Sequence, residues 1–174
     1  MQPIIYDVAV SADGYISGAG GDVSGFPHHG AIVDAYRARL ATYGTVLMGR
    51  ATYEFGLAYG LSPGANPYPG MRAFVVSTGM EPPDDADFEM LPDLDAVASI
   101  RAAADRPVYL CGGGILAGAM LARGLIDEIV LKRAPILLGA GVPLFAGDAP
   151  APAMSLAEHL DHGEGIVQQR YVRA

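Results

Sequence analysis

Three consecutive glycines, Gly112 to Gly114, stand between an apolar run and a segment of helical character. Without side chains they let a ligand approach the backbone, and a helix that starts at Ile115 and Leu116 has unpaired N–H donors in its first turn. The positive end of the helix dipole attracts anions, so this junction suits a pyrophosphate. A tight turn that binds no ligand is the alternative. The pattern matches neither GxGxxG nor the P-loop.

Two further junctions have the same character. In residues 47–54 a short apolar strand ends at Gly49, and Arg50 and Thr52 open a helix. The Arg50 guanidinium can bind a phosphate monoester with two N–H groups, while Thr52 can cap the helix or bind a phosphate oxygen. A capped helix with a solvent-exposed arginine is the alternative. Ser77 ends another strand. A serine at a strand end is more often a plain turn residue than a ligand contact. Three such strand ends together favour a dinucleotide with an extra phosphate.

The elements that would position these junctions alternate between strands and helices. We expect helices within 28–44, from Arg50 onward, over 93–104 with Asp93 or Asp95 as the cap, and over 115–125. The remaining apolar runs indicate strands, and the tail indicates an antiparallel pair around Gly163 and Gly165. The expected strands cover residues 4–11, 45–49, 72–78, 88–91, 107–111 and 127–138. This alternation predicts one α/β domain over 1–174 with a largely parallel sheet and an antiparallel edge.

The composition excludes several classes of protein. The net charge is −8, with ten arginines and one lysine, Lys132, so neither nucleic acid nor an anionic membrane is an expected partner. The single cysteine, Cys111, excludes an internal disulfide and a metal–thiolate cluster. No apolar run approaches the roughly 20 residues of a membrane span. The first residues lack the basic region of a secretory signal, so we expect a cytoplasmic protein. We also expect no metal site.

Four segments together resemble the dihydrofolate reductase superfamily, and within it the RibD C-terminal domain family of riboflavin biosynthesis. They read VSADGYIS, LMGRATYE, FVVST and, over 108–145, VYLCGGGILAGAMLARGLIDEIVLKRAPILLGAGVPLF. The resemblance runs from about residue 4 to 146. It implies a three-layer α/β fold with a mostly parallel central sheet of about eight strands, flanking helices and an antiparallel C-terminal edge.

The resemblance also implies NADPH as the cofactor. By motif position Arg50 would lie near the adenosine 2′-phosphate, Ser77 would contact that phosphate or the adenine, and the backbones of Ala9 and Ile16 would meet the nicotinamide carboxamide. The loop between these two residues would close over the cofactor. The remaining phosphate contacts would come from Gly49, Thr52, Gly112, Gly113, Gly114, Ile115 and Leu116.

Candidate substrate residues are fewer. Asp34 stands near the position at which the resemblance implies an acidic residue that helps to protonate a pterin, so it is the candidate catalytic acid. The chain has no tryptophan, which argues against folate reduction itself. Asp13 lies in the loop next to the nicotinamide and is either a turn residue or a substrate contact. Phe26 and Tyr59 are the candidate walls of a pocket for a flat heterocycle. Tyr53, a protonatable group near the cleft, is a further candidate substrate contact.

We therefore expect a reductase that passes a hydride from NADPH to a small heterocyclic substrate, such as a pterin, flavin or pyrimidine, or to a carbonyl compound. Two alternatives stay open. One is a non-catalytic NADP(H)-binding or ligand-sensing protein. The other is a 5-amino-6-(5-phosphoribosylamino)uracil reductase, for which Arg72 and Arg133 are the candidate phosphate ligands. The apolar segment 136–145 suggests a homodimer.

Overall fold

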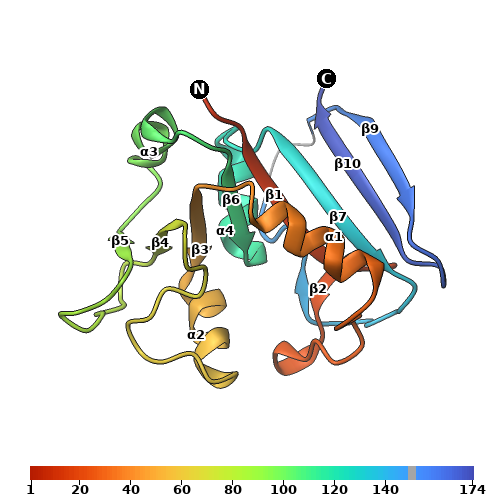
Figure 1. Cartoon of the computed structure of the whole chain (residues 1–174), viewed down its shortest axis with the longest axis horizontal. Coiled ribbons are helices and arrows are strands. Elements are labelled where there is room, and N and C mark those ends of the chain that lie inside the picture. The colour runs from red at the N-terminus through yellow and green to blue at the C-terminus, as the bar shows by residue number, and fades with distance from the viewer. Residues whose placement is uncertain (149–151) are drawn as a thin grey trace.

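The computed structural model describes residues 1–148 and 152–174, and within them one large sheet forms the centre of the molecule (Figure 1). Its eight strands follow the order β5-β4-β3-β6-β1-β7-β10-β9. The first six are parallel, and β10 and β9 add an antiparallel edge. The bounds are β1 Ile4–Ser11, β3 Thr45–Gly49, β4 Arg72–Val76, β5 Glu89–Leu91, β6 Val108–Gly112, β7 Glu128–Ala134, β9 Met154–Asp161 and β10 Val167–Arg173.

Helices cover both faces of the sheet (Figure 1). Alternate residues of a strand point to opposite faces, so Ile4 and Tyr6 of β1 join the core beneath α3 and α4, whereas Ile5 packs on the side of α1 and α2. The helices are α1 Ala31–Leu40, α2 Arg50–Ala58, α3 Val97–Ala103 and α4 Gly114–Ala122, with a short 3-10 turn, η1, at Ala19–Gly21. The predicted three-layer α/β fold is thereby confirmed.

Several element ends differ from the predictions for local reasons. Helix α3 begins at Val97 without a side-chain cap, because the Asp93 carboxylate accepts a hydrogen bond from the backbone N–H of Asp95 and forms a turn instead. Strand β7 ends at Ala134, since Pro135 has no N–H to continue the ladder. Among the described residues, no helix is long and apolar enough to cross a membrane.

A second, two-stranded sheet was not expected. Strand β2 (Tyr15–Ser17) pairs with β8 (Val142–Pro143), and both lie outside the strands expected from the sequence. The segment that follows β8 crosses α4 closely. A Cβ atom on Gly118 would stand 1.9 Å from the carbonyl oxygen of Ala146, so only glycine fits there. The N–H of Ala146 also donates to the Gly114 carbonyl at 3.0 Å. This crossing fixes α4, and with it the glycine turn.

The crossing predicts a large effect of one methyl group. Gly118→Ala should lower the free energy of unfolding by about 1–3 kcal/mol or more, because the backbone of the crossing segment must move. Urea unfolding measures this change. Gly56→Ala is the matched control, since its Cβ would meet only the flexible end of Leu61 at 3.1 Å. A Gly118→Ala protein as stable as the Gly56→Ala protein would contradict the close crossing.

Candidate functional site

A groove of about 580 Å³ runs between the first turns of α2 and α4. Because β4, β3 and β6 are neighbouring parallel strands, the three strand ends singled out in the sequence lie side by side, where these strands have their carboxyl ends. The groove is lined by residues of both glycine junctions together with Val142 of β8. The junction residues are Gly49, Arg50, Thr52, Gly113, Gly114, Ile115 and Leu116.

Both helices open into this groove without a capping side chain. The N-cap residues are Gly49 for α2 and Gly113 for α4, and neither helix has a side-chain hydrogen bond at its cap. Thr52 therefore does not cap α2. The first-turn N–H groups of two helices are left to bind an anion in the groove. Gly112, just before the turn, has a φ of 116°, which favours glycine, and the Gly112–Gly113 peptide bond is cis.

Arg50 forms the charged end of the groove. Its Nε donates to Oε1 of Glu54 at 2.7 Å, and its Nη1 donates to the carbonyl of Gly79 at 3.4 Å. The N–H of Gly79 in turn donates to Oγ of Ser77 at 3.2 Å, so the Ser77 turn and Arg50 are neighbours. Both side chains of the ion pair are about half exposed, so the pair is weak and an incoming phosphate can compete with Glu54.

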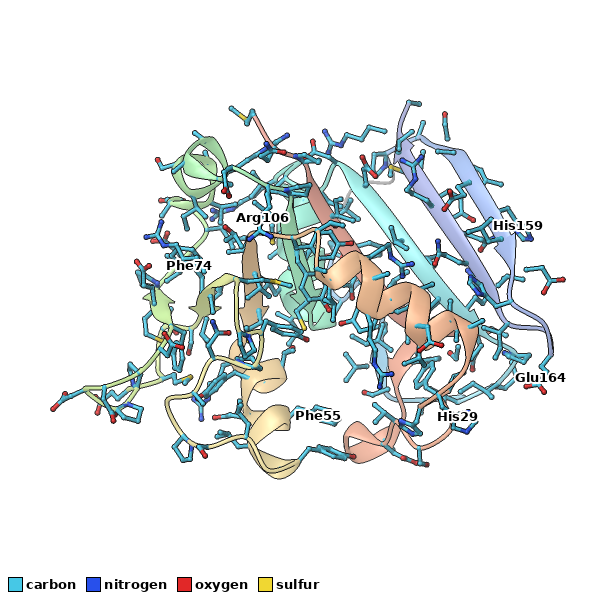
Figure 2. The ribbon with its side chains drawn as sticks, viewed as in Figure 1. His29, Phe55, Phe74, Arg106, His159 and Glu164 are labelled. Atoms are coloured by element: carbon cyan, nitrogen blue, oxygen red, sulfur yellow. The ribbon has the colours of Figure 1, made fainter. Side chains whose placement is uncertain are left out.

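An aromatic cavity of about 590 Å³ adjoins the groove, and Thr52 lines both. The cavity lies on the α1 and α2 face of the sheet, and Ala9 of β1 contributes to its wall. Figure 2 shows Phe55 projecting from α2, where its ring approaches the η1 turn. Tyrosines dominate the remaining aromatic lining: Tyr36, Tyr53, Tyr68 and Tyr109. A flat ring system suits such walls.

A buried carboxylate lies in the cavity wall. Asp7 is fully buried, and its oxygens accept hydrogen bonds from Nζ of Lys132 at 2.7 Å, from Nε of Arg39 at 2.8 Å and from the hydroxyl of Tyr43 at 3.0 Å. Burial alone would raise the pKa of Asp7, but the Lys132 and Arg39 charges outweigh it and hold the pKa below its ordinary value. Asp7 therefore stays ionised.

Lys132 is the cavity-lining cation that binds Asp7. Its Nζ lies 3.5 Å from the ring centroid of Tyr36, a cation–π geometry. Burial lowers the pKa of Lys132, and Asp7 offsets only part of that effect. Beside it, the hydroxyls of Tyr36 and Tyr109 share a hydrogen bond of 2.7 Å, and the Tyr68 hydroxyl lies 3.1 Å from the sulfur of Cys111. Protonatable groups thus converge on one wall.

The candidate catalytic acid lies elsewhere. Asp34 is on the outer side of α1, 74% exposed, and paired with Arg37 at 3.6 Å, and it does not line the cavity. The carboxylate of Asp13 accepts hydrogen bonds from the N–H groups of Leu138 and Gly139, so it fixes a turn. Phe26 lines an adjoining hollow, which shares Pro27 and Ile32 with the cavity. None of these three side chains lines the cavity itself.

Other predicted contacts fall in or beside the cavity. The Tyr53 ring lines it, although its hydroxyl accepts a hydrogen bond from the N–H of Gly64 at 2.8 Å. Ile16 lies beside Gly113, where a Cβ on the glycine would stand 4.0 Å from the Ile16 side chain. The two candidate phosphate ligands are both absent from the cavity wall: Arg72 is bound to Glu89, and Arg133 donates to the carbonyl of Ala12.

The Asp7–Lys132 pair was missed in the sequence, yet a signal for it exists. Asp7 is the one charge in the strand IIYDVAVS, and Lys132 follows the apolar run IVL in EIVLKRA, next to Arg133. Charges of opposite sign in two buried strands indicate that the strands are neighbours and that the charges meet. No group of three metal-ligating side chains occurs among residues 1–148 and 152–174.

The chain is similar over its whole length to proteins of one family. The sequence model of the RibD C-terminal domain matches residues 2–168. Two uncharacterized proteins of Bacillus subtilis, YwjB and YyaP, are each 26% identical, over 99% and 97% of this chain and 98% and 93% of their own lengths.

Solved structures show the same likeness. A protein of Shewanella sp. PV-4 that has been assigned to riboflavin biosynthesis superposes with a TM-score of 0.82 at 27% identity, over 100% of this chain and 99% of its own. Acinetobacter baumannii RibD superposes with a TM-score of 0.71 at 18% identity, which shows the fold alone. This chain corresponds to 58% of that longer protein.

The sheet order and these matches define the class: an α/β protein with the reductase-type fold of the dihydrofolate reductase superfamily. Within it, the chain belongs to the RibD C-terminal domain family.

The buried carboxylate leads to a prediction on stability and pH. Asp7→Asn should lower the free energy of unfolding at neutral pH by about 3–5 kcal/mol, because Lys132 and Arg39 lose their counter-charge. The pKa of Asp7 is lower in the folded chain, so its contribution is present above about pH 4 and is lost as the pH falls through the folded value. The difference between the two proteins should therefore shrink below about pH 4.

Urea unfolding across this pH range measures both effects. Glu89→Gln is the matched control, because it breaks an exposed ion pair and should cost about 1 kcal/mol or less. A pH-independent difference between wild type and Asp7→Asn would show that the carboxylate charge is not what stabilises the fold.

Proposed function

We propose that this chain is an NADPH-dependent reductase that passes a hydride to a small acceptor with a flat ring system. One observation carries the proposal: the groove into which α2 and α4 open and the aromatic cavity are adjacent, and Thr52 lines both. An anion-binding groove next to a ring-binding cavity suits a dinucleotide whose reactive end meets a second ligand.

The residues of the groove fit the phosphates of NADPH. The uncapped first turns of α2 and α4 would hold the pyrophosphate through backbone N–H groups. Gly113 leaves the turn bare, whereas the missing side chain of Gly114 makes room for the carbonyl of Pro143. Arg50 and Ser77 would hold the 2′-phosphate, because Arg50 lines the groove and Gly79 links it to the Ser77 turn. The exposed apolar side chain of Ile115 offers a surface for the adenine.

The cavity fits the acceptor. When bound, NADPH supplies the hydride, and the chain has to place the acceptor ring against it and exclude water. The tyrosine walls would do both, and the small side chains of Ala9 and Thr52 also line the cavity. Membership of a reductase family supports this proposal. Neither Arg72 nor Arg133, the two candidate ligands for a phosphoribosyl group, lines the cavity, whereas Arg37 does.

The proposal predicts selective binding of NADPH. Arg50→Ala should weaken NADPH about tenfold or more, through loss of a charge-assisted contact, and leave NADH within about twofold. Isothermal titration calorimetry with both nucleotides measures this. Arg72→Ala is the matched control, because Arg72 is an arginine of similar exposure that also forms an ion pair but lies outside the groove.

Two results would contradict the proposal. If the wild-type protein bound neither nucleotide, the groove would not be a dinucleotide site. If Arg50→Ala weakened NADPH and NADH equally, Arg50 would not read the 2′-phosphate.

A further inference from the structure

We propose that Lys132 is a catalytic residue of this reductase: its ammonium binds a carbonyl or imine group of the ring acceptor and gives it a proton as the hydride arrives. This inference rests on the proposed function. It adds an identified proton donor and a class of substrate, namely a flat ring system that carries a C=O or C=N group.

The position of Lys132 is the first support. Lys132 and Ala9 are register partners on β7 and β1, and both line the cavity. Asp7 precedes Ala9 by two residues on the same face of the sheet, which brings its carboxylate within 2.7 Å of Nζ. The Lys132 side chain is only 11% exposed, so its charge is directed into the protein rather than into bulk solvent.

The hydrogen-bond inventory of Lys132 is the second support. An ammonium has three N–H donors. One N–H donates to Asp7, and the Tyr36 ring makes a cation–π contact with the ammonium on another side. A donor thus remains for a ligand. The other cation beside Asp7 is already engaged, because Arg39 donates to Asp7 and to Gln168.

The surrounding groups favour Lys132 over its neighbours as the acid. Lys132 is faced by Asp7 from β1, by Arg39 and Tyr36 from α1, by Cys111 from β6 and by Gln168 from β10. Burial raises the pKa of the Tyr36 hydroxyl and of the Cys111 thiol, which makes both weaker acids. Burial has the opposite effect on the pKa of Lys132, which moves toward the range of an effective general acid.

The step balances without a further reagent. NADPH gives a hydride, with its two electrons, to the carbon of the C=O or C=N group and becomes NADP⁺. The π bond breaks, its electron pair moves to the oxygen or nitrogen, and that atom takes a proton from Nζ of Lys132. The product is an alcohol or amine, and Lys132 regains its proton from solvent. Asp7 remains a carboxylate throughout and orients the ammonium.

The experiment uses three flat probes and three variants. Lumazine offers C=N bonds, isatin a ketone, and alloxazine a larger ring system with both groups. NADPH oxidation with each probe is followed for wild type, Lys132→Met, Lys132→Arg and Arg133→Met. Arg133 is the matched control, because it is the next residue on β7 and does not line the cavity. Calorimetry with NADPH and thermal unfolding check that each variant is intact.

We expect wild type to reduce at least one probe. Lys132→Met should lower kcat at least about 100-fold, the usual contribution of a general acid, with NADPH affinity unchanged. Lys132→Arg should keep the KM for the probe but lose kcat, because arginine keeps the charge and the donors but does not release a proton. Arg133→Met should resemble wild type. A purely structural Lys132 would not separate kcat from KM in this way.

A second measurement follows the proton donor directly. Because the chain contains a single lysine, labelling with lysine that carries ¹⁵N at Nζ gives one side-chain signal. Addition of a probe whose binding has been shown by calorimetry should shift this signal. An unshifted signal, or full kcat in Lys132→Met, would overturn the role of Lys132 and leave the reductase proposal standing.

The remaining outcomes are also decisive. NADPH binding to wild type without oxidation by any of the three probes would overturn the substrate class. Absence of NADPH binding to wild type would overturn the proposed function, and the catalytic role of Lys132 with it.

Discussion

The structure around the cavity depends on one buried carboxylate. An ionised Asp7 in the interior would be costly unless it were paired and fully hydrogen-bonded, and donors from β7, from α1 and from the loop after α1 meet that need. Lys132 joins β7 to β1, while Arg39 and Tyr43 bring in α1 and its C-terminal end. Arg39 also binds Gln168 of β10, so the antiparallel edge is connected to the same charge. One carboxylate thus holds the helix, the edge strands and the cavity wall together.

The groove and the cavity offer two different kinds of polar surface. The groove relies on backbone N–H groups and an exposed arginine, which are suited to phosphates that stay partly hydrated. The cavity relies on a few buried side chains among aromatic rings, where each hydrogen bond has a defined direction. Thr52 stands where the two surfaces meet. The arrangement would let a long, charged ligand and a short, flat one meet at Thr52 while their other contacts stay separate.

Much of this could be predicted from local sequence patterns. The glycine junctions at 49 and 112–114 and the strands before them were found because each junction is contiguous in sequence. Asp34 shows the opposite case. The apolar spacing of Ile32, Tyr36 and Leu40 fixes the inner face of α1 and already turns Asp34 away from it. The family resemblance placed Asp34 at the substrate site, whereas the helical periodicity of α1 places it on the outer side.

What escaped prediction involves partners far apart in the chain. Asp7 and Lys132 are 125 residues apart, so their pairing becomes visible only when β1 and β7 are known to be neighbours. Strands β2 and β8 are two or three residues long, too short for any periodicity to show. The position of Phe26 depends on loop geometry, for which the sequence carries little signal. Long-range pairing and loop paths, rather than element types, set the limit.

The small β2–β8 sheet has a kinetic consequence. It contains few hydrogen bonds, and Tyr15, Ile16 and Val142 are only partly covered, so its local opening costs far less free energy than global unfolding. Val142 lines the groove, and Ile16 adjoins Gly113. Opening of this sheet therefore changes access to the groove while the eight-stranded sheet stays intact. Under the proposed function, the residence time of the dinucleotide would depend on a handful of backbone hydrogen bonds, separately from the contacts that determine its affinity.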